Sequence, residues 1–266
     1  MKRIFSLLLF VSLVSLVTAQ GRGAKVTGEE ISYKSADGTV LKGYIAYDEA
    51  KKGKRPAVVV IHEWWGNNDY SRQRADMLAG LGYIAIAADM YGGGKEGPTP
   101  AEAKELAMPF YTNPQLAKER IEAAVNKLKE YEQTDASQLA CIGYCFGGSM
   151  SLNAANLGMD FKAVVSFHGG LQVVPAEEGK TKAKVLVCHG GADTFVSEEE
   201  IKKFKDNMDA AKVDYTFITY PDATHAFTNT EATEKGKKFN IPIAYNFAAD
   251  KKSWEDMKEF LKKALQ

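Results

Sequence analysis

The chain has 266 residues, of which 45% are hydrophobic and 26% are charged, the composition of an ordinary globular protein. Lysine plus arginine and aspartate plus glutamate each number 34, so the formal net charge is zero. A neutral chain lacks the concentrated positive charge that binds nucleic acids and anionic membranes, so neither is an expected partner.

The N-terminus has the pattern of an export signal. A Lys-Arg pair precedes the apolar stretch 4–16, and residues with small or short side chains lead up to Ala19. This predicts a signal peptide over 1–19 and one mature domain over 20–266, exported to a periplasm or to the medium. An uncleaved membrane anchor is the alternative. The stretch is short for a membrane span and is interrupted by serines, so we expect no stable membrane insertion after cleavage.

The mature chain begins with a predicted β-hairpin. Segments 30–34 and 40–47 alternate in polarity and flank Asp37-Gly38, a dipeptide that favours a tight hairpin turn. Strand-like and helix-like segments then follow one another. We expect strands at 57–61, 83–88, 139–144, 161–167, 183–189 and 215–220, and helices at 71–81, 114–132, 149–157, 197–211 and 248–265. This alternation predicts an α/β fold with a mostly parallel sheet of about eight strands and helices on both faces.

Segment 91–113 interrupts the alternation. It contains three consecutive glycines and three prolines. We expect an irregular excursion over the carboxyl end of the sheet, where chemistry gathers in such folds. It is either part of a substrate rim or a surface loop.

The hexapeptide 143–148, Gly-Tyr-Cys-Phe-Gly-Gly, joins a predicted strand to a predicted helix. An abrupt turn flanked by glycines in that context is typical of a nucleophile elbow, which exposes the central side chain above the sheet. The central residue is Cys145, and the N-terminus of the following helix favours its thiolate. A buried structural cysteine is the alternative. Cys141 and Cys188 lie inside apolar runs and are expected to be small core residues, so no disulfide framework is predicted.

Two further candidates also follow predicted strands. Asp193 comes after strand 183–189, and His225 comes after strand 215–220. The order nucleophile, acid, histidine is that of an α/β-hydrolase, in which the three side chains meet at one sheet edge. We therefore expect Cys145 to attack an acyl carbonyl, His225 to transfer the proton, and Asp193 to orient the imidazole.

The tetrahedral intermediate of such a reaction needs backbone N–H donors. The amide of Phe146, directly after the nucleophile, is one candidate. The second is the amide of Trp64, in the loop 62–66 after the first buried strand. Among nearby aromatic residues, Trp65, Tyr91 and Phe227 are candidates to line an apolar pocket, together with the side chains of these two donors, and core packing is the alternative.

Several of these pieces together resemble the dienelactone hydrolase family, over residues 25–265. The matching segments are His62-Glu63-Trp64-Trp65-Gly66, Ala88-Asp89-Met90-Tyr91, the hexapeptide 143–148, Gly190-Gly191-Ala192-Asp193, His225-Ala226-Phe227 and the tail from Tyr245 to Trp254. The resemblance implies an α/β-hydrolase fold and hydrolysis of esters or lactones by a Cys-His-Asp triad. It also implies that Glu63 holds the Cys145 thiol neutral at rest, and that substrate displaces the carboxylate and frees the thiolate to pair with His225. For Glu63 a solvated loop carboxylate is the alternative.

The sequence departs from the family where dienelactone-cleaving members grip a substrate carboxylate. Those members place one arginine two residues after the tyrosine matched by Tyr91 and another four residues after the histidine. The corresponding residues here are Gly93 and Asn229, and neither can form a cationic fork, although Lys95 lies nearby. A neutral ester or lactone is therefore the expected substrate.

No cofactor is expected. The chain has no dinucleotide or phosphate-loop spacing, and its four histidines form no zinc pattern. His168 and His189 are expected to be structural. We therefore predict an exported, cofactor-independent hydrolase of small esters or lactones that acts through a thioester, and the sequence leaves the oligomeric state open. The alternative is an exported binding or thiol-redox protein on a hydrolase scaffold, and the redox role would need a second reachable thiol.

Overall fold

The computed structural model describes residues 24–265, so the predicted signal peptide at 1–19 lies outside the described residues. Eight strands form one sheet. They are β1 (Val26–Lys34), β2 (Val40–Asp48), β3 (Arg55–Ile61), β4 (Ile84–Ala88), β5 (Thr134–Tyr144), β6 (Ala163–Phe167), β7 (Lys184–Gly190) and β8 (Tyr215–Tyr220). The helices are α1 (Asp69–Gly80), α2 (Pro100–Thr112), α3 (Pro114–Lys129), α4 (Phe146–Asn156), α5 (Glu198–Ala210), α6 (Ala232–Phe239) and α7 (Phe247–Ala264).

The strand order is β1-β2-β4-β3-β5-β6-β7-β8. β1 and β2 form the predicted antiparallel hairpin, and β2 also runs antiparallel to β4. Every other pairing is parallel. The predicted fold class, a mostly parallel α/β sheet of about eight strands, is confirmed.

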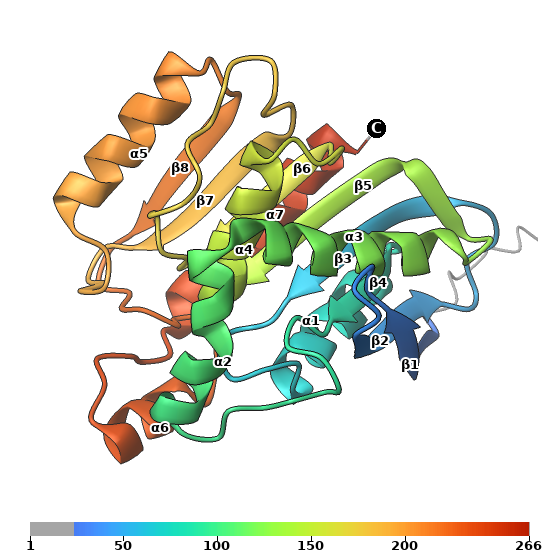
Figure 1. Ribbon diagram of the computed structural model, residues 1–266, viewed down its shortest axis with the longest axis horizontal. Coiled ribbons are helices and arrows are strands. Elements are labelled where there is room, and N and C mark those ends of the chain that lie inside the picture. The colour runs from blue at the N-terminus through green and yellow to red at the C-terminus, as the bar shows by residue number, and fades with distance from the viewer. Residues whose placement is uncertain (1–23, 266) are drawn as a thin grey trace, which may run out of the picture.

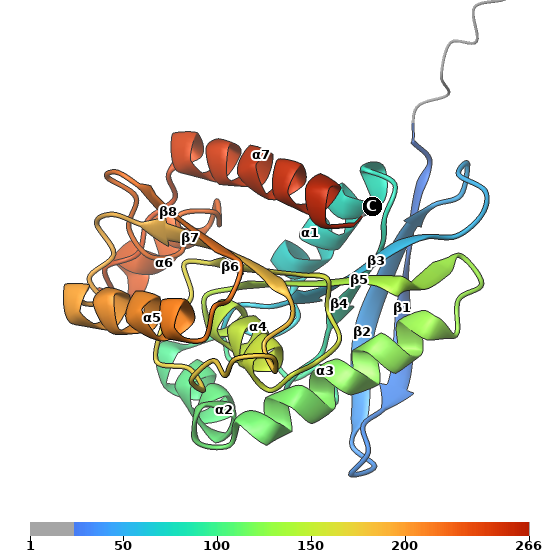
Figure 2. The ribbon, with the colours of Figure 1, turned by 90° about the horizontal axis from the view of Figure 1, so that it is seen from above.

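Helices cover both faces of the sheet, as Figure 2 shows from above, with α1 and α7 on one side and α2, α3, α4 and α5 on the other. The period of two along each strand produces the two cores. In β5, for example, Leu139 and Cys141 belong to the core under α3 and α4, whereas Ala140 and Ile142 belong to the core under α1 and α7. Strands buried on both faces explain the continuous apolar runs of the sequence.

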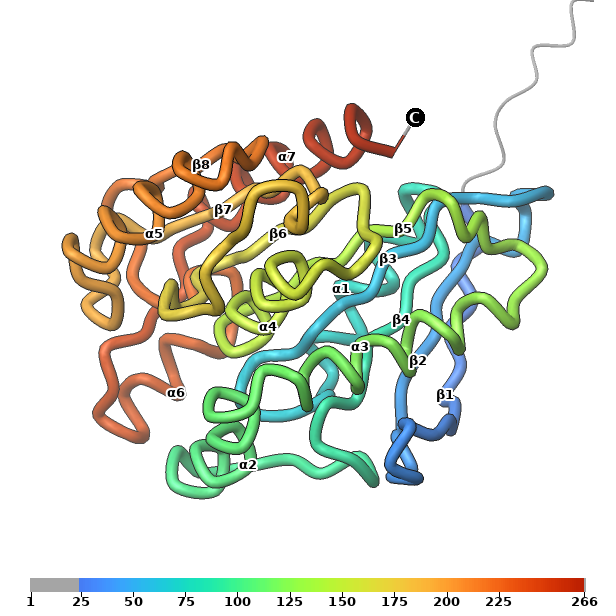
Figure 3. The backbone as a smooth tube through the Cα atoms, turned by 45° about the horizontal axis from the view of Figure 1, so that its top comes forward, coloured from blue at the N-terminus to red at the C-terminus, as the bar shows by residue number. Residues whose placement is uncertain are grey.

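Two helices were not expected from the sequence. Segment 91–113 was expected to be irregular, but its second half forms α2 (Figure 1). α2 begins with a capping box, in which Thr99 Oγ1 accepts the Glu102 N–H and the Glu102 carboxylate accepts the Thr99 N–H. The short helix α6 follows the His225 loop. Figure 3 shows both helices at the edge of the sheet where the parallel strands end.

Candidate active site

Cys145 occupies the abrupt turn between β5 and α4. Its backbone has φ 54° and ψ −116°, a conformation that is costly for any residue with a Cβ atom. Its N–H donates to Phe167 O at 3.0 Å and to His168 Nδ1 at 3.1 Å. These hydrogen bonds hold the turn in place, and the side chain remains partly exposed.

The elbow packs directly against the end of β3. A Cβ atom at Gly147 would lie 2.3 Å from Ile61 O, and the Gly147 N–H donates to His62 O at 3.1 Å. Only glycine permits this approach of backbone to backbone. Cys145 is thereby placed against the loop that begins at His62.

His225 lies on the loop after β8 and Asp193 on the loop after β7, so parallel strands bring both residues to the same edge as Cys145. The Nδ1 atom of His225 lies 2.8 Å from Asp193 Oδ2. Asp193 is fixed in turn, because its other carboxylate oxygen accepts the Phe195 N–H at 2.9 Å. The predicted acid and histidine are therefore in direct contact, with Asp193 behind the imidazole.

Opposing effects set the protonation of His225. Burial disfavours the charged imidazole, but the neighbouring Cys145 sulfur and Asp193 carboxylate outweigh it and raise the pKa of His225 from 6.5 to about 10. The imidazolium is thus the favoured form of His225 at neutral pH.

The loop after β3, which carries the Trp64 amide, is fixed by side-chain hydrogen bonds. His62 is fully buried, and burial lowers its pKa to about 4, so the ring is neutral. Nε2 accepts the Met90 N–H at 3.3 Å, so Nδ1 carries the proton and donates to Glu63 O at 2.5 Å. The Tyr91 hydroxyl donates to Trp64 O at 2.9 Å. These bonds orient the loop backbone, and the Phe146 N–H, as the first amide of α4, has no partner within the helix.

Glu63 is buried and contacts Asn229, not Cys145. Asn229 Nδ2 donates to Glu63 Oε2 at 2.6 Å, and Glu63 Oε1 has no hydrogen-bond partner within residues 24–265. Burial raises the pKa of this carboxyl. The contact with Cys145 expected at rest is absent among these described residues, and Cys145 faces His225 instead. The structure therefore does not bear out the expected resting contact between Glu63 and Cys145.

A cavity of about 230 Å³ opens above Cys145. Its walls are mainly apolar, and no lysine or arginine is among the described residues that line it. The lining residues are Glu63, Trp64, Trp65, Tyr111, Cys145, Gly170, Phe195, Val196, His225, Ala226, Ile241 and Ile243.

Of the aromatic residues predicted to line the pocket, Trp64 and Trp65 do so, but Phe146 does not, because its ring packs in the core against Tyr91 and Phe110. Tyr91 and Phe227 do not line the cavity either. Tyr91 packs in the core on His62 and Phe146, and its hydroxyl is used by the Trp64 carbonyl. Phe227 is fully buried on the other core. These three predictions are corrected. Each residue belongs to a matching motif, but its side chain points away from the cavity and into the packed interior.

Sequence reasoning missed two aromatic residues of the cavity, Tyr111 and Phe195. Tyr111 is carried by α2, whose start was readable from the capping box Thr99-Pro100-Ala101-Glu102. Phe195 lies two residues after Asp193, and its ring centroid is 5.0 Å from that of His225. Its position in the loop after β7 was the feature of the sequence that could have predicted its place at the cavity.

His168 supports the two halves of the site together. While Nδ1 accepts the Cys145 N–H, Nε2 lies 2.7 Å from Thr228 Oγ1 in the His225 loop. Burial lowers the pKa of His168, which keeps the ring neutral and able to accept. Cys141 and Cys188 are free and buried, and burial raises the pKa of both thiols.

The helices within residues 24–265 are too short or too polar to cross a membrane. No group of three or more histidine, cysteine or acidic side chains in that range could hold a metal ion.

Comparison with known proteins places this geometry in context. The model of the dienelactone hydrolase family matches residues 41–265. The usf protein of Aquifex pyrophilus is 30% identical over 207 residues, covering 76% of this chain and 87% of its own. The crystal structure of a dienelactone hydrolase-like promiscuous phosphotriesterase from metagenomic libraries superposes with a TM-score of 0.84 at 34% identity, covering 92% of this chain and 100% of its own. A structure named m3DLH gives the same TM-score at 33% identity, covering 91% and 99% of the two chains.

Proposed function

The chain belongs to the dienelactone hydrolase family, and on this premise we propose that it hydrolyses neutral carboxylic esters or lactones through a thioester on Cys145. The observation that carries the proposal is a row of three side chains at one cavity. Asp193 contacts His225 at 2.8 Å, and the Cys145 sulfur beside His225 raises the pKa of its imidazole. A thiolate beside an imidazolium supplies a nucleophile and a proton donor at once.

In the proposed reaction the Cys145 sulfur attacks the carbonyl carbon and the carbonyl π electrons move to oxygen. When the tetrahedral intermediate collapses, the bond to the leaving oxygen breaks, and His225 gives that oxygen its proton. The acyl group remains on sulfur as a thioester. His225 then takes a proton from water, the resulting hydroxide attacks the thioester, and sulfur leaves as thiolate. Throughout, Asp193 accepts the hydrogen bond from Nδ1 and keeps Nε2 directed at the site.

The charge on the intermediate needs donors, and we assign this role to the backbone amides of Trp64 and Phe146. The support is local: His62 and Tyr91 orient the loop through the carbonyls of Glu63 and Trp64. Fixed backbone donors stabilise the developing oxyanion without reorganisation during the reaction.

Glu63 is proposed to alternate between two partners. Asn229 donates to one oxygen of the carboxylate, and the other oxygen has no hydrogen-bond partner within residues 24–265. Glu63 and Cys145 both line the cavity. Because burial raises the pKa of Glu63, its protonated form could hydrogen-bond the sulfur at rest, and an acyl group entering the cavity would leave Glu63 on Asn229.

The preference for neutral substrates rests on the cavity wall. A substrate carboxylate in this cavity would meet Glu63, and no lysine or arginine is among the described lining residues. Asn229, at one of the two positions where an arginine would grip an anion, is already bound to Glu63. An uncharged acyl group is therefore favoured.

The nucleophile is tested with Cys145→Ala and His225→Ala. We expect kcat/KM for p-nitrophenyl butyrate to fall by about 10³-fold or more in each variant, since the residues act as a unit. Circular dichroism controls for folding, and a mass increase of one butyryl group on Cys145 reports the thioester. Turnover that survives in Cys145→Ala would disprove the mechanism.

Substrate charge is tested with a matched pair, p-nitrophenyl butyrate and mono-p-nitrophenyl succinate, which differ mainly by one carboxylate. We expect the butyrate to react at least about tenfold faster, because the succinate carboxylate would meet Glu63 and neither a lysine nor an arginine among the described lining residues. A faster succinate would overturn the assignment.

Export is proposed from the signal-like N-terminus. The mature protein expressed from the full chain should begin at Gln20 and be found outside the cytoplasm. A thiol-redox role is disfavoured, because Cys141 is fully buried in the core and cannot meet an external disulfide.

A further inference from the structure

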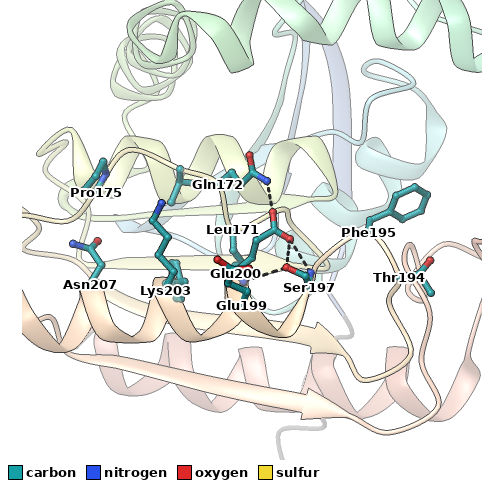
Figure 4. Close-up of a pocket in the computed structure, with 12 residues that line it drawn as sticks. Leu171, Gln172, Pro175, Thr194, Phe195, Ser197, Glu199, Glu200, Lys203 and Asn207 are labelled. Atoms are coloured by element: carbon teal, nitrogen blue, oxygen red, sulfur yellow. Dashed lines mark hydrogen bonds between the residues drawn. The ribbon is translucent and has the colours of Figure 1, made fainter.

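A second hollow of about 990 Å³ lies beside the catalytic cavity, between the segment after β6 and helix α5 (Figure 4). We call it the α5 groove. Its lining residues are Leu171, Gln172, Val173, Pro175, Thr194, Phe195, Ser197, Glu199, Glu200, Lys203, Phe204 and Asn207.

The α5 groove adjoins the cavity. Phe195 borders both spaces. Two chain segments also pass from one to the other: Gly170 lines the cavity and Leu171 the groove, and Val196 lines the cavity and Ser197 the groove. A substrate that extends from the cavity past Phe195 would therefore meet the groove.

The groove lies on the side of the site where the alcohol leaves. In the proposed reaction His225 protonates the departing oxygen, so the alcohol part of an ester must pass His225. The Phe195 ring meets the His225 ring edge-on at 5.0 Å, and 52% of Phe195 is exposed. In the proposed reaction the acyl part would lie in the apolar cavity, whose lining residues include Trp64 and Trp65.

The groove differs from the cavity in chemistry. Three side chains that line the groove have no hydrogen-bond or ion-pair partner within residues 24–265, namely those of Thr194, Glu199 and Lys203. Figure 4 shows Lys203 reaching from α5 toward the segment after β6. Glu200 is already occupied, because it accepts the Ser197 N–H at 2.7 Å and a hydrogen bond from Gln172. Free donors and acceptors therefore lie beside an exposed aromatic ring.

We propose that the α5 groove binds the alcohol part of the substrate, and that this part is an uncharged polyhydroxylated alcohol such as a sugar. The proposal rests on the ester hydrolysis proposed above. Hydroxyl groups can donate to Glu199 and accept from Lys203, while a sugar's C–H face packs on the Phe195 ring. Water adds across the ester bond, so the products are the carboxylic acid and the free polyol.

The charges of the groove limit which alcohols it can bind. Glu199 and Glu200 face one ammonium, that of Lys203, so a phosphorylated or carboxylated alcohol would meet net repulsion. A long alkyl chain would bury the free polar groups without replacing their hydrogen bonds with water. Neutral hydroxyls satisfy both conditions.

The test compares kcat/KM for 6-O-butyrylglucose and n-hexyl butyrate, which share the acyl group, with p-nitrophenyl butyrate as the measure of ester hydrolysis itself. We expect the sugar ester to be favoured over the hexyl ester by about tenfold or more, the equivalent of one or two net hydrogen bonds. Lys203→Ala and Glu199→Ala should each lower this ratio about fivefold.

Lys202→Ala is the matched control, because Lys202 lies next to Lys203 on α5, is exposed, pairs with Asp206 and does not line the groove. It should leave the ratio unchanged. If p-nitrophenyl butyrate turns over but the ratio is near one and insensitive to Lys203, the groove proposal is wrong and the proposed function stands.

Binding without turnover gives a second readout. Saturation-transfer NMR on Cys145→Ala should show contact between the protein and the sugar protons of 6-O-butyrylglucose, and Lys203→Ala added to that variant should weaken it. Absence of contact with the sugar ring overturns the groove proposal even if no ester is hydrolysed.

Discussion

Burial and charge act in opposite directions on His225. The imidazole is enclosed beside Phe195 and His168, which disfavours its protonated form. Cys145 and Asp193 favour that form more strongly, and the pKa rises to about 10. The proton needed by a leaving alcohol is therefore already on the ring at neutral pH.

This predicts an alkaline limit to activity. His225 keeps its proton below about pH 10 and loses it above, so kcat/KM for alkyl esters should fall as the pH rises through 10. Asp193→Asn removes one cause of the raised pKa of His225, so the fall in kcat/KM at alkaline pH should begin at a lower pH. The measurement is the pH profile of kcat/KM for n-hexyl butyrate.

p-Nitrophenyl butyrate is the control for this profile, because its leaving group departs without being protonated and should show a weaker alkaline limb. If kcat/KM of Asp193→Asn falls at the same alkaline pH as that of the unmodified protein, the role assigned to the Asp193 carboxylate is wrong.

At the residue scale, the sequence indicated which positions meet but not which way every side chain points. Cys145, Asp193 and His225 could be placed together because each follows a strand of one parallel sheet. Tyr91 and Phe227 also lie in motifs at strand ends, yet both point into the core. The carboxylate contact of Glu63 with Asn229 joins residues 166 positions apart, and no local pattern predicts it.

At the element scale, the elbow depends on glycines that let α4 touch β3. The clash at Gly147 would be with the backbone atoms Ile61 O and His62 O, at 2.3 and 2.6 Å, and backbone atoms cannot rotate away as a side chain can. The contact also sets the distance between the sulfur and the Trp64 loop.

Gly147→Ala should therefore lower the free energy of unfolding by about 3 kcal/mol or more, because an added methyl group forces backbone shifts. Urea unfolding followed by circular dichroism measures it. Gly80→Ala is the control, since its Cβ would meet only Val26 Cγ2 at 3.9 Å and alanine favours helix. Equal stability of the two variants would show that the close approach is not required.

Helices α2 and α6 were not predicted, and each shows why a local sequence pattern can fail to reveal a helix. The capping box at Thr99 and Glu102 marked the start of α2, but Pro109 inside the helix and the preceding glycines obscured it. α6 has no side-chain cap at its start and spans 8 residues, too few to show a helical period. The long helices and the strands buried on both faces were readable because their periodicity extends far enough.

At the scale of the whole molecule, Arg74 connects parts far apart in the chain. It lies on α1, is buried, and donates to Asp250 Oδ1 of α7 at 2.6 Å and to Thr228 O of the His225 loop at 2.7 Å. Its guanidinium also lies over the rings of Tyr70, Tyr144 and Trp254. One side chain thus joins α1, the elbow strand, the histidine loop and the C-terminal helix.

Arg74→Leu should lower the free energy of unfolding by about 3–5 kcal/mol, because it leaves Asp250 and the Thr228 carbonyl without their partner in a buried setting. It should also lower kcat more than it raises KM, since the Thr228 contact holds the His225 loop and the acyl cavity is untouched.

Adding Asp250→Leu should recover part of the stability, because no unpaired carboxylate then remains. Arg72→Leu, on the same helix, removes only an exposed pair with Glu30 and should cost about 0–1 kcal/mol. If Arg74→Leu proves as mild as Arg72→Leu in urea unfolding and in kcat, the helix and the histidine loop are held by packing alone.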